Sequence, residues 1–258
     1  MVIRLADGTV TTIDFRETAP AAAFRDMFLN DSMQVIPGKS WNTSWASGVP
    51  GSVAGYGYAH KKYGTAKWKT LLTPAVKLAE NGFPLDYLNM NYFNSEYYNA
   101  YLSNDSESRK IFSKEVEFQL GENFVQKDLG KTLERISKQG WQEFYSGKTA
   151  DMIINCMHRT KGLISKADLE NYQVMERYPI TFDYRGYEVH SMPPASSGGI
   201  AIAGILNQLE NIQMDSLKYH SAQHIHFVAE AERRVYADRA EFMGDMDFVP
   251  VPIDRLIS

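Results

Sequence analysis

The stretch that decides the fold reads YEVHSMPPASSGGIAIAGILNQL and runs from Tyr187 to Leu209. Its first five residues are rich in aromatic and β-branched side chains, which favours a strand. Two prolines end that strand. The segment Ser196–Gly199 then offers hydroxyl groups and unhindered backbone before an apolar run that begins at Ile200. The pattern predicts a strand, a glycine-rich turn and a helix, an arrangement typical of α/β proteins.

The turn at Ser196–Gly199 has two interpretations. Unpaired backbone N–H groups at a helix start can bind an anion or a substrate carbonyl. Alternatively, the glycines let helix and strand approach each other closely, as they do at many corners of α/β proteins. The motif alone favours close packing over a ligand site.

A second informative stretch lies near the start of the sequence. Two strand-like segments, residues 2–5 and 10–15, flank an Asp-Gly pair, which predicts a β-hairpin. The second segment leads into Arg16 and a bend that ends at a proline. An arginine placed at a strand end can bind both oxygens of a carboxylate. The alternative, which spacing alone favours, is a surface ion pair of Arg16 with Glu17 or Asp14 that adds little stability.

Together these stretches resemble the γ-glutamyltranspeptidase (glutathione hydrolase) family. The matching motifs occur in order, at family-like spacing, over nearly the whole chain, and their succession makes the resemblance specific. One departure is Ala195, where the family often has a third proline, and we expect it to alter the turn's rigidity more than its chemistry. The segments that carry the resemblance are residues 14–20, 46–55, 63–65, 74–83, 183–187, 192–200, 229–232, 236–239 and 244–248.

The resemblance implies an α/β fold, the αββα sandwich of N-terminal-nucleophile hydrolases, in which two β-sheets lie between helical layers. It identifies the chain as an incomplete large-subunit portion, expected to form a single α/β unit over residues 1–258 without separate domains. In this family a precursor cuts itself in two, and the new N-terminal Thr of the small subunit is the nucleophile. The sequence contains no Thr-Thr-His segment, so we expect no catalytic residue in this chain.

By resemblance, the parent enzyme moves the γ-glutamyl group of glutathione to water or to an amino acid or peptide acceptor. The resemblance implies neither an organic cofactor nor a metal. It assigns Arg16 as the ligand of the glutamyl α-carboxylate. It makes Glu17 a candidate for orienting the Arg16 side chain. The expected partner is the small subunit of the same precursor, in a heterodimer. The alternatives are an inactive truncated remnant, a non-catalytic module that binds glutamate or another carboxylate, and a relative that processes poly-γ-glutamate.

Composition agrees with an ordinary globular protein. The 258 residues are 44% hydrophobic and 22% charged, and the net charge of −4 argues against non-specific nucleic-acid binding. No apolar run reaches membrane-spanning length. The start lacks a signal peptide, although the resemblance places the parent protein in the periplasm or outside the cell. The single cysteine, Cys156, permits no internal disulfide and lies in an apolar run, which predicts a buried, unreactive thiol.

Two other patterns invite a functional interpretation. The glycines between Gly48 and Gly57 resemble a phosphate-binding loop, but they lack its Gly-Lys-Ser/Thr ending and favour close helix packing instead. His220, His224 and His226 resemble a metal-binding cluster. At helical spacing His226 points away from the other two, so the pattern favours an ordinary helix start.

Hydrophobic periodicity and capping residues predict the remaining elements, in the order strand pair, helical middle, strand pair and helices. The predicted strands of the second pair cover residues 178–184 and 187–192. The predicted helices cover residues 53–62, 68–80, 87–102, 123–139, 149–159, 166–172, 200–209 and 221–242.

We predict that the 258-residue chain by itself does not cleave γ-glutamyl bonds. The expected nucleophile is missing, and oxyanion-hole donors alone are commonly worth about a hundredfold in rate. The measurement is incubation with a chromogenic γ-glutamyl anilide. Turnover above a buffer blank that survives repurification would contradict the prediction.

Overall fold

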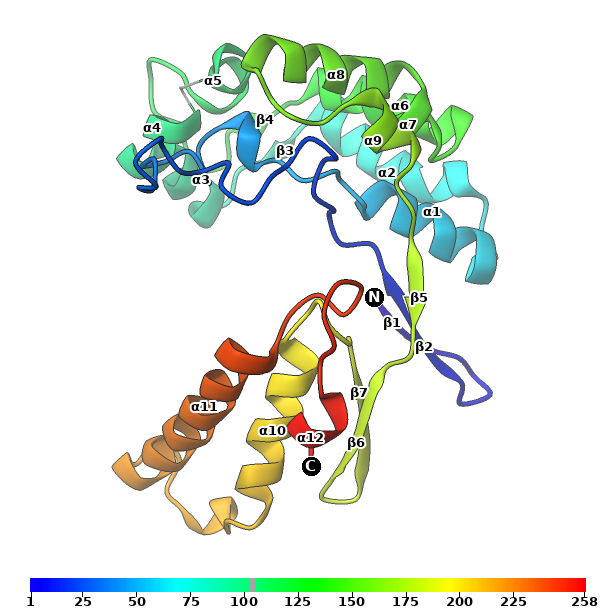
Figure 1. Ribbon diagram of the computed structural model, residues 1–258. Coiled ribbons are helices and arrows are strands. Elements are labelled where there is room, and N and C mark those ends of the chain that lie inside the picture. Colours follow the sequence, from blue (N-terminus) through cyan, green and yellow to red (C-terminus); the bar gives the residue numbers. More distant parts are fainter. Residues whose placement is uncertain (103–104) are drawn as a thin grey trace. The chain divides into compact units, whose positions relative to one another are not determined.

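The computed structural model describes residues 1–102 and 105–258. Helices account for 50% of the chain and strands for 11%. The chain divides into two compact units, one formed by residues 1–15 and 174–258 and the other by residues 16–173. Figure 1 labels the elements of both units. The expectation that residues 1–258 form a single α/β unit stays a prediction.

The first unit contains an antiparallel sheet in the order β1-β2-β5. Strands β1 (Val2–Arg4) and β2 (Val10–Asp14) form the predicted hairpin. Its turn needs Gly8, whose φ of +91° is readily adopted only by glycine. Strand β5 (Met175–Arg177) pairs with β2 and was not predicted. A strand this short shows no alternation that a sequence pattern can detect.

The stretch that opened the sequence analysis also lies in this unit. Strands β6 (Ile180–Tyr184) and β7 (Tyr187–Ser191) form an antiparallel hairpin, and helix α10 (Gly198–Glu210) packs against it. Helix α11 (Ala222–Phe242) lies beside α10, as Figure 1 shows. The short helices are residues Met214–Ser216 (a 3-10 turn) and α12 (Ile253–Leu256). The buried core consists of Ile180, Phe182, Ile200 and Ala203.

The glycine-rich turn serves close packing, as the motif favoured. A Cβ atom on Gly199 would lie 3.1 Å from Ser191 Cβ and 3.2 Å from Ile180 Cγ1, and closer still to a backbone carbonyl. The hydroxyl of Ser197 makes no capping bond to the helix. It accepts a hydrogen bond from Arg239 Nε instead, at 2.9 Å.

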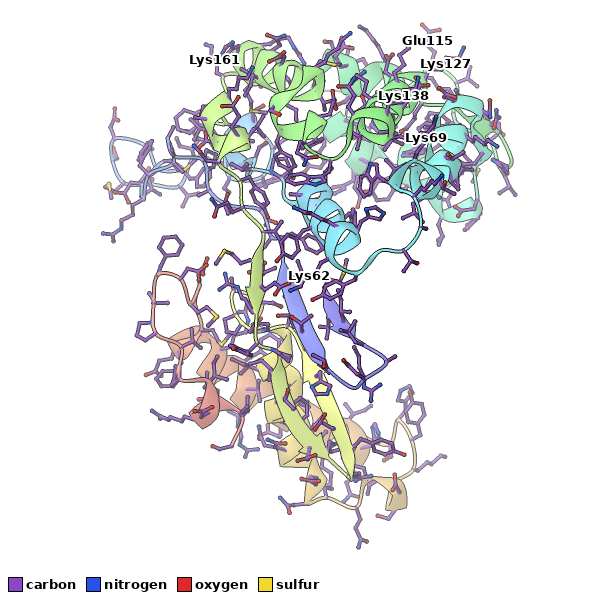
Figure 2. All side chains as sticks on the ribbon, turned by 90° about the vertical axis from the view of Figure 1, so that its right-hand side faces the viewer. Lys62, Lys69, Glu115, Lys127, Lys138 and Lys161 are labelled. Carbon is purple, nitrogen blue, oxygen red and sulfur yellow. The ribbon has the colours of Figure 1, made fainter. Side chains whose placement is uncertain are left out.

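The second unit is mainly helical, and its helices largely match the predicted ranges. Helices α2 and α6 pack along each other. Lys69 of α2 and Lys138 of α6 are labelled in Figure 2, and both lower the pKa of Glu134, chiefly through the hydrogen bond from Lys138. The helices are α1 (Ser52–Tyr63), α2 (Trp68–Asn81), α6 (Lys127–Gln139), α7 (Glu143–Ser146), α8 (Lys148–Thr160) and α9 (Lys166–Glu170), with a 3-10 turn at Ser44–Ala46.

Residues 83–102 and 105–124 of this unit contribute a small core of their own. Strands β3 (Phe83–Pro84) and β4 (Asn123–Phe124) pair there. The helices are α3 (Tyr87–Asn94), α4 (Glu96–Leu102) and α5 (Ser106–Phe112). Leu85, Phe118 and Phe124 are buried, with Met90, Phe93 and Phe112 packed against them.

The prediction of one helix over residues 87–102 is wrong, because the helix is interrupted at Ser95, which separates α3 from α4. The side chain of Asn94 accepts a hydrogen bond from Phe118 N at 2.8 Å and donates one to Phe118 O at 2.9 Å. This amide therefore binds a backbone segment distant in sequence at the point where α3 ends. A periodic pattern contains no sign of such a contact.

The packing interpretation of the Gly48–Gly57 segment is confirmed. Gly57 lies on α1 against the indole of Trp141, and a Cβ at that position would lie within 2.8 Å of Trp141 Cβ. Any larger residue there would force the two segments apart.

Of the helices in the described parts of the chain, none combines the length and the apolar composition needed to cross a membrane.

Arg177 connects the sheet of the first unit to the loop after α11. Its Nε donates to Asp14 on β2 at 2.8 Å, and both terminal nitrogens donate to Asp247, one of them at 2.8 Å. Its side chain is only 12% exposed. The hydroxyl of Thr12 donates to Arg177 O at 2.7 Å. The guanidinium also lowers the pKa of Asp247, chiefly by hydrogen bonding.

We predict that Arg177→Met lowers the free energy of unfolding by about 3 kcal/mol, because a nearly buried carboxylate loses its guanidinium. The matched control is Lys166→Met, which removes an exposed ion pair with Asp151 (2.9 Å) and should leave the free energy of unfolding nearly unchanged. Urea unfolding of both variants measures the difference. Equal losses would show that Arg177 acts as an ordinary surface charge.

Candidate functional site

Arg16 and Glu17 follow β2 and begin the second unit. Both side chains are exposed, at 55% and 64%, and Arg16 Nε lies 3.9 Å from Glu17 Oε1. The structure therefore brings the two candidate residues together in a loose surface pair. Their proposed roles toward a substrate stay predictions.

The backbone that carries these exposed side chains is held at several points. Thr18 and Val49 form an isolated β-bridge, with Val49 N donating to Thr18 O at 2.8 Å. The hydroxyl of Tyr172 donates to Arg16 O, also at 2.8 Å. Further along, Ala21 N donates to a carboxylate oxygen of Asp168 at 2.8 Å. The guanidinium thus projects from a fixed main chain, which lowers the entropic cost of binding a ligand.

The Ala46–Gly55 motif contacts the Arg16–Glu17 segment directly. A Cβ atom on Gly48 would lie 2.8 Å from Glu17 Cγ and 2.9 Å from Glu17 Cβ. The aliphatic part of Glu17 therefore packs on the bare backbone of Gly48. Glycine at this position lets the two motifs meet.

Tyr145 holds the other end of this motif. Its hydroxyl donates to Pro50 O at 2.7 Å and accepts from Ala54 N at 3.1 Å. Its ring stacks on Tyr172, with centroids 5.7 Å apart and planes 15° from parallel. The side chain is 5% exposed, and burial raises the pKa of Tyr145 to about 12. Sequence reasoning missed both tyrosines, because neither belongs to a motif that the family resemblance had singled out.

The histidine pattern does not form a metal site. Tyr219 stacks on His220 at 3.8 Å and meets the ring of His224 edge-on at 5.4 Å. Within residues 1–102 and 105–258, no group of three or more His, Cys, Asp or Glu side chains is placed to hold a metal ion. Cys156 is half-buried on α8 rather than fully buried as predicted.

The arrangement of Arg16 and Glu17 is chemically compatible with the predicted binding of a carboxylate. An exposed guanidinium on an anchored backbone can donate two parallel hydrogen bonds to one carboxylate. Glu17 lies next to the guanidinium and packs against Gly48.

Solved structures place the fold among the N-terminal-nucleophile hydrolases. The γ-glutamyltranspeptidase of Helicobacter pylori matches with a TM-score of 0.96 at 43% identity, over 100% of this chain and 74% of that one. The Pseudomonas nitroreducens γ-glutamyltranspeptidase, solved with L-DON, gives 0.92 at 37% identity, over 100% and 76%. The Bacillus anthracis transpeptidase CapD gives 0.73 at 27% identity, over 100% and 78%. The predicted α/β fold class is confirmed.

The family model described as gamma-glutamyltranspeptidase matches residues 1–258, so the chain belongs to the γ-glutamyltranspeptidase family. The glutathione hydrolase proenzyme of Escherichia coli K12 is 47% identical over 100% of this chain and 44% of its own length. The proenzyme of Pseudomonas sp. strain A14 is 43% identical over 100% of this chain and 45% of its own length. The chain therefore spans less than half the length of these curated relatives.

We predict that Tyr145→Phe destabilises the protein by about 1–2 kcal/mol at pH 8, because the partly buried carbonyl of Pro50 and the buried N–H of Ala54 lose their partner. Since the pKa of Tyr145 is raised to about 12 from its ordinary value of 10.0, the stabilisation is complete below pH 10 and is lost as the pH rises toward 12. The free energy of unfolding of Tyr145→Phe should therefore not show this decrease as the pH rises from 10 toward 12.

The measurement is denaturant unfolding between pH 8 and pH 11.5. Tyr178→Phe is the matched control, because Tyr178 is 95% exposed, and it should keep both the stability at pH 8 and the alkaline loss. If the Tyr145 and Tyr178 variants had identical pH profiles, the buried-hydroxyl account would be wrong.

Proposed function

We propose that this chain is the large-subunit portion of an enzyme that transfers the γ-glutamyl group of glutathione to water or to an amino acid or peptide. Membership of the family supports the proposal, as do relatives named glutathione hydrolase proenzymes. Two solved γ-glutamyltranspeptidases match this chain with higher TM-scores and identities than the transpeptidase CapD does.

Arg16 carries the proposal for this chain. The γ-glutamyl end of glutathione bears an α-carboxylate, and the planar fork of arginine matches its two oxygens. The bond from Tyr172 and the Thr18–Val49 bridge fix the main chain at Arg16 and two residues after it. In this proposal Glu17 orients the guanidinium and takes no part in the chemistry.

In the proposed reaction, a small subunit cut from the same precursor completes the active site. The two subunits form a heterodimer. The small subunit's N-terminal Thr attacks the γ-carbonyl, its own amine accepts the proton, and backbone N–H groups stabilise the oxyanion. The departing amine takes up a proton, and water or an acceptor amine then cleaves the acyl-enzyme. No metal or organic cofactor takes part. The proposed location is the periplasm or the outside of the cell.

We predict that Arg16→Lys, in the full-length protein containing this chain, raises the Michaelis constant for the γ-glutamyl donor roughly ten- to a hundredfold. Lysine offers one point contact where arginine offers two, and a hydrogen bond to a charged group is worth about 1.5–3 kcal/mol. Precursor cleavage should persist, because it precedes substrate binding. Donor kinetics and a gel for subunit formation measure the two effects.

Arg25→Lys is the matched control, because Arg25 lies in the same segment and its side chain is 94% exposed. The Michaelis constant of Arg25→Lys for the γ-glutamyl donor should equal that of the unmodified protein. An unchanged constant in Arg16→Lys, or a precursor that remains uncut, would remove Arg16 from substrate binding and leave it as a structural residue.

A further inference from the structure

The segment that contains α1 and most of α2 differs in charge from the rest of the chain. Residues 32–79 contain six lysines and no Asp or Glu, whereas the whole chain has a net charge of −4. Four of these lysines are exposed and lie at the turn between the two helices: Lys61, Lys62, Lys67 and Lys69. Figure 2 labels Lys62, at the end of α1, and Lys69, in the first turn of α2. Positive charge is therefore concentrated at one corner of the second unit.

Hydrogen bonds and an aromatic contact hold this turn in place. His60 Nε2 donates to Ala66 O across the turn, at 2.7 Å. The ring of His60 lies 5.2 Å from the ring of Trp68, centroid to centroid. Trp68 Nε1 in turn donates to Ile136 O on α6 at 3.0 Å. The lysines therefore project from a fixed backbone, and less conformational freedom is lost when they meet a charged surface.

Helix α2 adds exposed apolar side chains beside these lysines. The helix packs against α6 and buries Ala79. A different face presents residues that follow one another at helical spacings of four, three and four: Lys67, Leu71, Pro74 and Leu78. The two leucines are 52% and 54% exposed. An apolar row that begins at a lysine and lies beside further lysines is typical of a helix that rests on a membrane surface.

Lysines outnumber the carboxylate that they share near Lys69. Glu134 on α6 pairs with Lys138 at 2.6 Å, and Lys69 helps to lower the pKa of the same carboxylate. A surplus of positive charge next to exposed leucines fits a partner that offers negative charge and an apolar layer together. Anionic lipid offers both, whereas a soluble polyanion offers only the charge.

We infer that this corner is a membrane-binding surface, which lays the exposed face of α2 on a bilayer containing anionic lipid. The ammonium groups of Lys61, Lys62 and Lys67 lie among the lipid headgroups, and Leu71 and Leu78 reach the boundary with the acyl chains. The inference does not depend on the proposed function, which assigns no role to these residues.

The test measures binding of the full-length protein containing this chain to lipid vesicles. Vesicles of phosphatidylglycerol and phosphatidylcholine in equal parts should bind the protein, and vesicles of phosphatidylcholine alone should not. Added salt should weaken the binding. The triple variant Lys61→Gln, Lys62→Gln, Lys67→Gln should bind about a hundredfold more weakly, since each lysine near an anionic surface contributes about fivefold. Leu71→Ser with Leu78→Ser should weaken binding about tenfold, because less apolar surface is buried.

The matched control replaces three other exposed lysines by Gln: Lys161, Lys166 and Lys218. It changes the net charge equally and should leave vesicle binding unchanged, and urea unfolding checks that every variant folds. Equal binding to the two kinds of vesicle, binding to neither, an equal loss in both triple variants, or undiminished binding of the leucine variant would overturn the inference. Retention on heparin without binding to the vesicles would also overturn it and would assign the surface to a soluble polyanion.

Discussion

The buried hydroxyl of Tyr145 is the contact on which the geometry of the candidate site depends. Backbone groups that lack partners inside a protein destabilise the fold, and this one hydroxyl satisfies the partly buried Pro50 O and the buried Ala54 N together. The ring of Tyr145 then stacks on Tyr172, whose own hydroxyl binds Arg16 O. The backbone that carries two exposed charges is therefore held in place by an aromatic pair.

Arginine–carboxylate pairs occur in this chain in two environments, and burial separates their roles. Arg177 is 12% exposed and ties a loop to a sheet, so its charges are compensated inside the protein. Arg159 pairs with Asp105 at 2.7 Å, is 46% exposed and lines a pocket. The first arrangement stabilises the fold, because removing either partner would leave the other charge unpaired where water can barely solvate it. The second contributes little to stability and remains accessible to a ligand.

The proposed function assigns this chain one end of glutathione. Arg16 would bind the carboxylate of the glutamyl end, next to Glu17, whose side chain packs on Gly48. Arg16 projects from an anchored segment, and little conformational freedom is lost when the substrate binds. The reacting groups would then come from the small subunit, while this chain would position the substrate.

The sequence by itself determined the hairpin at Gly8, most helices, the close-packing glycines and the family, because these depend on local propensity, periodicity and ordered motifs. It also identified Arg16 and Glu17 through the resemblance. Only the tertiary structure decided the interruption between α3 and α4 at Ser95, the pairing of β5 with β2, and the stacking of Tyr145 on Tyr172. These features depend on contacts between residues far apart in the chain, such as Tyr172 with Arg16, 156 positions away. No local pattern encodes such a contact, since it forms only when the intervening helices pack.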